Sequence, residues 1–68
     1  MHVYRAHFEL NGHLDVHEFL SADETSALAH LMSLKPRYAA AELWKGNTFL
    51  LSVAARNIVA RSGAAKHS

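Results

Sequence analysis

HVYRAHFELNGHLDVHEFL, residues 2–20, decides the fold, because two runs of alternating apolar and polar residues flank Leu10-Asn11-Gly12. Strict alternation is typical of strands with one buried face, and an Asn-Gly pair between two such runs marks a hairpin. The stretch therefore predicts a β-hairpin with one apolar face and one polar face.

The register of this hairpin depends on the length of its loop. A two-residue turn at Asn11-Gly12 would set Phe8 opposite Asp15 and mix apolar with charged residues on both faces. A three-residue loop of residues 10–12, with Gly12 left-handed, instead pairs Phe8 with Leu14. We therefore predict the three-residue loop. Its apolar face would hold Tyr4, Ala6, Phe8, Leu10, Leu14 and Val16.

The opposite face of the predicted hairpin collects three histidines and an aspartate. His13, Asp15 and His17 point the same way at intervals of ~6.8 Å. His7 would stand across from Asp15, so that these two and either flanking histidine can converge on zinc. His13 and His17 are ~13 Å apart and cannot share one ion. The alternative is a solvated face whose histidines titrate without binding metal.

Ser21-Ala22-Asp23-Glu24 has the pattern of a capping box and predicts a helix that begins at Ala22. The apolar stripe that follows is typical of a helix lying on a sheet. Because Pro36 disfavours helical geometry at Lys35, the helix should end near Leu34 or Lys35. The stripe consists of Leu28, Leu31 and Met32, flanked by Ala27 and Leu34.

Residues 38–53 form a second alternating stretch, around Gly46-Asn47. A three-residue loop over residues 45–47 pairs Leu43 with Phe49, and a two-residue Gly-Asn turn is the alternative. With the three-residue loop, the inward face would hold Ala39, Ala41, Leu43, Phe49, Leu51 and Val53.

The same register leaves an apolar group on the sheet face opposite the helix. Apolar side chains on an open sheet face indicate a partner surface, and Trp is a frequent anchor in such surfaces. The alternative is that the indole covers neighbouring side chains or lies under the C-terminal segment. The predicted interface consists of Trp44, Leu50, Phe19 and Val3.

Segment 56–68 shows no clean alternation. It allows a short helix through Arg61 that ends at Gly63, and we expect the last five residues to be disordered. The predicted fold is therefore α+β: one ββαββ domain over residues 1–55, with two hairpins in an antiparallel sheet and one helix on one face. Residues 56–68 would form a partly helical extension.

Length and composition restrict the class of protein. The chain has 68 residues, seven Lys and Arg against six Asp and Glu, and no cysteine. Disulfides and thiolate metal sites are thus excluded, and small folds without such cross-links often self-associate. No apolar run approaches the ~18 residues of a membrane span. We expect a cytoplasmic protein without a membrane role, either a homo-oligomer or the binder of a protein partner.

Nucleic-acid binding is a weaker alternative. It would use Arg5, Arg56, Arg61 and Lys66, with Trp44 stacking on a base. These basic residues are scattered along the chain, and acidic residues share the proposed platform. A net charge of +1 is also far from the strong positive balance of a dedicated nucleic-acid binder.

An enzymatic role finds no support in the spacing of residues. No serine or threonine has a nearby base implied by the sequence, and cysteine is absent. The pair of Asp15 and His7 lacks a nucleophile and an enclosed cleft. We therefore expect no enzymatic activity and no cofactor.

Four segments carry a resemblance: Tyr4-Arg5, Asn11-Gly12-His13, residues 23–29 and residues 42–47. Over about residues 3–53 the chain resembles a group of short bacterial proteins of unknown function with the pattern YR … G … DEEAL … ELWxGxRxV. Thr48 stands where that group commonly has a basic residue, and the segment after residue 53 has no counterpart in the group. The resemblance implies a shared fold and no particular activity. The predicted function is a small self-associating or protein-binding module.

Overall fold

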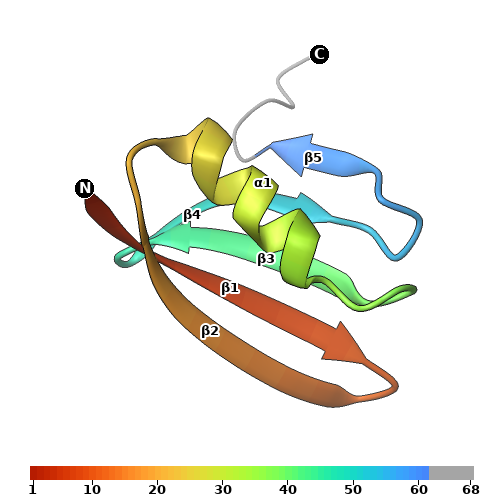
Figure 1. Cartoon of the computed structure of the whole chain (residues 1–68). Coiled ribbons are helices and arrows are strands. Elements are labelled where there is room, and N and C mark those ends of the chain that lie inside the picture. The colour runs from red at the N-terminus through yellow and green to blue at the C-terminus, as the bar shows by residue number, and fades with distance from the viewer. Residues whose placement is uncertain (62–68) are drawn as a thin grey trace.

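The structure, a computed structural model, describes residues 1–61. Within these residues the strands form one antiparallel sheet in the order β2-β1-β3-β4-β5, and one helix lies across one face (Figure 1). The predicted α+β class is therefore confirmed. The elements are β1 (His2–Leu10), β2 (His13–Ser21), α1 (Glu24–Leu34), β3 (Ala40–Lys45), β4 (Thr48–Val53) and β5 (Val59–Arg61).

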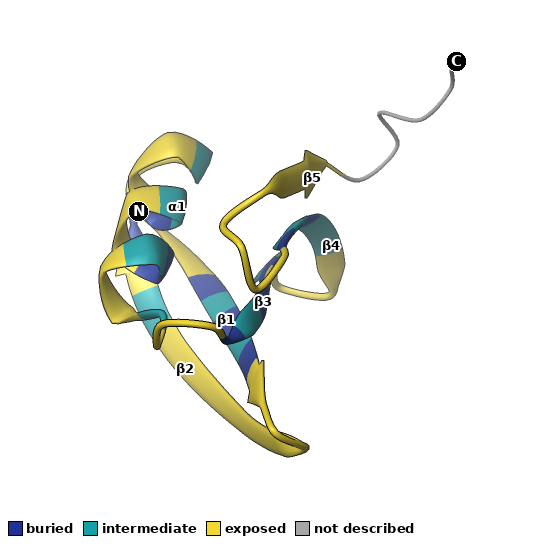
Figure 2. Ribbon diagram, turned by 90° about the vertical axis from the view of Figure 1, so that its right-hand side faces the viewer, coloured by how far each residue is buried: buried dark blue, intermediate teal, exposed yellow. Residues whose placement is uncertain are grey.

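The strand order, which the sequence left open, makes β1 and β3 neighbours at the inner positions and puts β2 and β5 at the edges. Figure 2 shows that buried positions cluster on β1, β3, β4 and the facing side of α1, whereas β2 is exposed along almost its whole length. Small residues in this core allow the helix to lie close to the sheet. The core cluster consists of Tyr4, Ala6, Phe8, Ala27, Leu31, Ala41, Leu43, Leu51 and Val53.

The predicted C-terminal helix is wrong, because residues 59–61 form β5 against β4. The amide of Ala54 donates to the carbonyl of Ile58 at 2.9 Å, and Asn57 is left-handed with φ 64°. This third hairpin extends the sheet past the predicted boundary at residue 55. Gly63 and the last five residues lie outside the described residues.

The first hairpin closes with a two-residue turn. Asn11 and Gly12 have φ values of 54° and 84°, as a type I′ turn requires at both central positions. The turn pairs Leu10 with His13 and Phe8 with Asp15. The predicted three-residue loop is therefore wrong, and the one-residue shift moves every side chain of β2 to the other face of the sheet.

Turn chemistry outweighs hydrophobic patterning here because β2 is an edge strand. Register is strongly specified only where one face of a strand is buried. Asp15 and His17, which occupy the helix side of β2, are themselves exposed, so the inward position that we predicted for Leu14 and Val16 offers the fold little burial. The preference of Asn-Gly for the type I′ turn therefore decides the register.

The second hairpin also has a two-residue turn, which pairs Lys45 with Thr48 and Leu43 with Leu51. The predicted three-residue loop and its pairing of Leu43 with Phe49 are therefore wrong, and the two-residue alternative is confirmed. The register shifts after Trp44 pairs with Phe49, and Leu50 is the extra residue of the resulting bulge. The predicted inward residues of this hairpin are therefore confirmed, except that Phe49 faces away from α1. Those that are buried are Ala39, Ala41, Leu43, Leu51 and Val53.

Helix α1 begins two residues later than predicted, at Glu24, and Asp23 is its N-cap. The Asp23 carboxylate accepts a hydrogen bond from the amide of Ser26 at 2.8 Å. Ser21 is instead the last residue of β2 and is buried, so the predicted capping box is wrong. The predicted end of the helix is confirmed, because Lys35 has the extended geometry expected before proline.

Asp23→Ala is expected to lower the thermal midpoint of unfolding, because it removes the acceptor for the Ser26 amide. Hydrogen bonds from Ser26 hold the pKa of Asp23 below its usual value. Stabilisation from a depressed pKa is present above the unfolded-state pKa and is lost as the pH falls through the folded-state value. Circular dichroism melts of the variant and the parent should therefore differ at neutral pH and converge in acid. Ser21→Ala is the control, and a larger loss with it would restore the capping box.

Candidate interaction surface

The sheet face turned away from α1, which we call the outer face, carries an exposed apolar strip on the first hairpin. Side chains alternate between the two faces along each strand, and residues paired across β1 and β2 share a face. The members of this strip therefore all lie on the outer face. Its members are among the most exposed large apolar residues of the described chain. The strip consists of Val3 at 46%, Leu14 at 73%, Val16 at 57% and Leu20 at 64% exposure.

The free edge of β2 lies beside the apolar strip. Because the turn makes Leu10 and His13 a hydrogen-bonded pair, alternate residues of β2 from His13 onward bond to β1. The residues between them direct their N–H and C=O groups away from β1, to solvent. These residues, which we call the free-edge set, are Leu14, Val16, Glu18 and Leu20.

Trp44 lies on the outer face but is partly covered by its neighbours. Its ring stacks on His7 at 5.7 Å and meets Phe49 edge-on at 5.5 Å. The indole Nε1 donates to the carboxylate of Glu42 at 3.1 Å. The Nε2 atom of His7 is buried without a hydrogen-bond partner within residues 1–61. This arrangement supports the alternative in which Trp44 covers neighbouring side chains.

The structure divides the predicted interface between the two faces. Trp44 and Val3 lie on the outer face as predicted, whereas Phe19 and Leu50 are partly buried against the core cluster. The ring of Phe19 lies 6.1 Å from Tyr4 and 4.3 Å from His30. The assignment of Phe19 and Leu50 to the outer face is wrong, because both depended on turns that were one residue too long.

The predicted metal ligands do not converge. His7 is on the outer face opposite Val16, whereas His13, Asp15 and His17 point toward the helix side of β2. Among residues 1–61, no three His, Cys, Asp or Glu side chains come close enough to hold a metal ion. The geometric basis of the metal prediction is therefore wrong, because it required His7 across from Asp15.

The arginines proposed for nucleic-acid binding point in different directions. Arg5 donates to the carbonyl of Gly46 at 2.7 Å, beside the turn between β3 and β4. Arg61 forms an ion pair with Glu24 on the helix side, and Arg56 is exposed in the turn before β5. Lys66 lies outside the described residues. The three arginines therefore form no single basic face.

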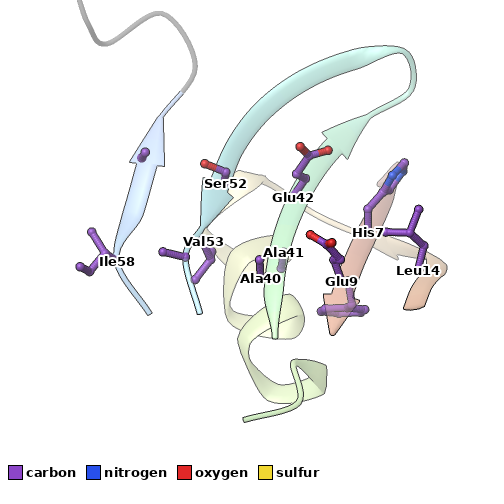
Figure 3. A pocket seen from close by; sticks show the side chains of 12 residues that line it. His7, Glu9, Leu14, Ala40, Ala41, Glu42, Ser52, Val53 and Ile58 are labelled. Carbon is purple, nitrogen blue, oxygen red and sulfur yellow. The ribbon is translucent and has the colours of Figure 1, made fainter. Parts of the chain in front are cut away.

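A groove of about 470 Å³ crosses the outer face next to the apolar strip (Figure 3). It is hollow because Ala40, Ser52 and Ala60 are small, and the carboxylates of Glu9 and Glu42 stand over it. Within the described part of the chain, neither carboxylate has an ion-pair partner. Two uncompensated carboxylates repel phosphate, so this groove also argues against nucleic-acid binding on the outer face.

Sequence reasoning missed the free-edge set. The signal that could have found it is Asn11-Gly12, because this dipeptide is the strongest short-range mark of a two-residue hairpin. The groove was missed for another reason. Its far wall includes Ile58 and Ala60, and it exists only because β5 joins the sheet.

Comparisons with protein-family models, with curated proteins and with solved structures found no match. Within residues 1–61, no helix has the length and apolar character needed to cross a membrane.

Proposed function

We propose that this protein is a self-associating module, in which the free edge of β2 pairs with β2 of a second copy and joins two sheets into one. The observation that carries this proposal is that Leu14, Val16 and Leu20 belong both to the free-edge set and to the exposed apolar strip. Main-chain hydrogen bonds would supply the attraction, and the strip would add apolar contacts.

Exposed edge strands are usually protected in native proteins by shortness, bulges, Pro or charged side chains, Lys above all. β5 follows this pattern, since it has three residues and Arg61 ties it to α1 through Glu24. β2 follows it only in part: it carries Asp15 and Glu18, but it has nine residues, regular pairing with β1, and neither Pro nor Lys. Such a long regular edge favours pairing with another strand.

A second copy is the partner that best fits this edge. A twofold axis perpendicular to the sheet would make two β2 strands antiparallel and keep both outer faces on one side. The two apolar strips would then be continuous across the junction. A chain of 68 residues without disulfides also has a small core, and self-association is a common way for such folds to add buried surface.

Val16→Pro is expected to convert a dimer into a monomer while the fold persists. The N–H of Val16 points to the free edge, so proline removes no hydrogen bond to β1 but blocks an added strand. Sedimentation velocity over a concentration series should show the dissociation constant rising at least ~10-fold, which corresponds to about 1.4 kcal/mol. Circular dichroism should stay unchanged.

Val16→Thr is the matched control, because threonine keeps the branched shape and the N–H group. This variant should sediment like the parent protein. A parent chain that stays monomeric into the high micromolar range, or a Val16→Pro variant that still dimerises, would contradict the proposal.

A further inference from the structure

The backbone of β2 restricts how two copies can pair through it. In an antiparallel ladder, two residues that exchange hydrogen bonds must both direct their backbone groups toward the shared edge. Only members of the free-edge set do so. Twofold symmetry adds that if one residue faces a second residue of the partner, the second must face the first.

These two conditions leave few registers that use most of the edge. A register centred on Val16 pairs Leu14 with the partner's Glu18 and leaves Leu20 of both copies unpaired. A register centred on Glu18 leaves Leu14 unpaired and sets two carboxylates opposite each other, which is destabilising. A register centred on His17 uses the whole free-edge set of both copies.

We infer that two copies pair in the register that places His17 on the twofold axis, an inference that rests on the proposed self-association. In this register Leu14 lies opposite the partner's Leu20, and Val16 lies opposite the partner's Glu18. All backbone donors and acceptors of the free-edge set are then satisfied. Unpaired backbone groups are costly once an interface excludes water, so the fully paired register is preferred.

The side chains on both faces are compatible with this register. On the outer face, leucines that are 73% and 64% exposed in the single chain would cover each other across the junction. On the helix side, His17 of one copy would lie opposite His17 of the other, and Asp15 would lie opposite the partner's Phe19. The imidazole of His17 meets Phe8 edge-on, with the ring centres 5.5 Å apart, and the residue is exposed at the edge of the sheet.

Charge substitutions at position 17 test this register directly, because a residue on the axis faces itself. His17→Lys and His17→Glu should each weaken the homodimer several-fold at low ionic strength, since like charges would stand opposite each other. An equimolar mixture of the two variants should form a heterodimer. In the register centred on Val16, position 17 faces the partner's Asp15. His17→Lys would then strengthen the homodimer, and this result would overturn the inference.

Single cysteines supply a second measurement, because the natural chain contains none. Directly opposed residues that do not exchange hydrogen bonds have Cα atoms ~4.5 Å apart, within the range of a disulfide. His17→Cys should therefore cross-link under mild oxidation faster than Val16→Cys or Glu18→Cys. Faster cross-linking of either control would place that residue, and not His17, on the twofold axis and would overturn the register. A sedimenting dimer without cross-linking at His17→Cys would overturn the register alone, whereas a strict monomer would overturn both proposals.

Discussion

Leu31→Ala is expected to unfold a large fraction of the protein. Leu31 is fully buried on the side of α1 that faces the sheet. Truncation of a buried leucine costs about 2–5 kcal/mol, because it removes apolar contacts and leaves a cavity. A domain of 68 residues has a free energy of unfolding of roughly 3–10 kcal/mol in total. Urea denaturation followed by circular dichroism should therefore show a much lower midpoint or no folded baseline.

Leu34→Ala is the matched control, since it makes the same chemical change on the same helix. Leu34 is 41% exposed and does not belong to the core cluster. Its truncation should lower the free energy of unfolding by less than about 1 kcal/mol. Equal losses for the two variants would mean that α1 is not held to the sheet by the face that contains Leu31.

Ala27→Phe is expected to destabilise the fold by the opposite mechanism, overpacking. Ala27 is fully buried where α1 meets the sheet, and Ala6 and Ala41 of the same cluster are also small. A phenyl ring there must push the helix outward or force its neighbours off their rotamers, at a cost of about 1–3 kcal/mol. The thermal midpoint and the free energy of unfolding in urea should both fall.

Ala29→Phe is the control for this prediction, because Ala29 is exposed on the same helix. It carries the same loss of helix propensity without the steric conflict, so its effect should be a few tenths of a kcal/mol. If Ala27→Phe were as well tolerated as this control, the close contact between helix and sheet would not be a determinant of stability.

Local patterns predicted much of the core. Alternation placed Tyr4 and Phe8 of β1 and Leu43 of β3 on the buried face, where the structure has them. Pro36 marked the end of α1 correctly. These predictions hold because each depends on a neighbour one or two positions away: the pleat of a strand alternates its side chains, and a proline restricts the residue before it.

The sequence placed only two of the four predicted interface residues on the correct face of the sheet. Trp44 and Val3 were assigned to the correct face, but Phe19 and Leu50 were not. A change of one residue in loop length, or one bulge, inverts the faces of everything that follows in the strand. The hydrophobic pattern fixes the register only in a strand that buries one of its faces. β2 is exposed along almost its whole length, so its pattern does not fix its register.

The sequence by itself determined that β1 to β4 are strands, that α1 is a helix, and which residues of β1 and β3 face the core, because these features depend on short-range backbone and side-chain periodicity. It did not determine β5, which forms where a short helix was predicted. The tertiary structure alone decided the order β2-β1-β3-β4-β5, and with it which strand has an unpaired edge. The reason is physical. Alternation says that a strand has two different faces but not which strands lie beside it. Neighbours depend on long-range packing, which here joins Ala27 and Leu31 of α1 with side chains of β1, β3 and β4 in one core. The free edge of β2, on which the proposed self-association depends, is a product of that packing.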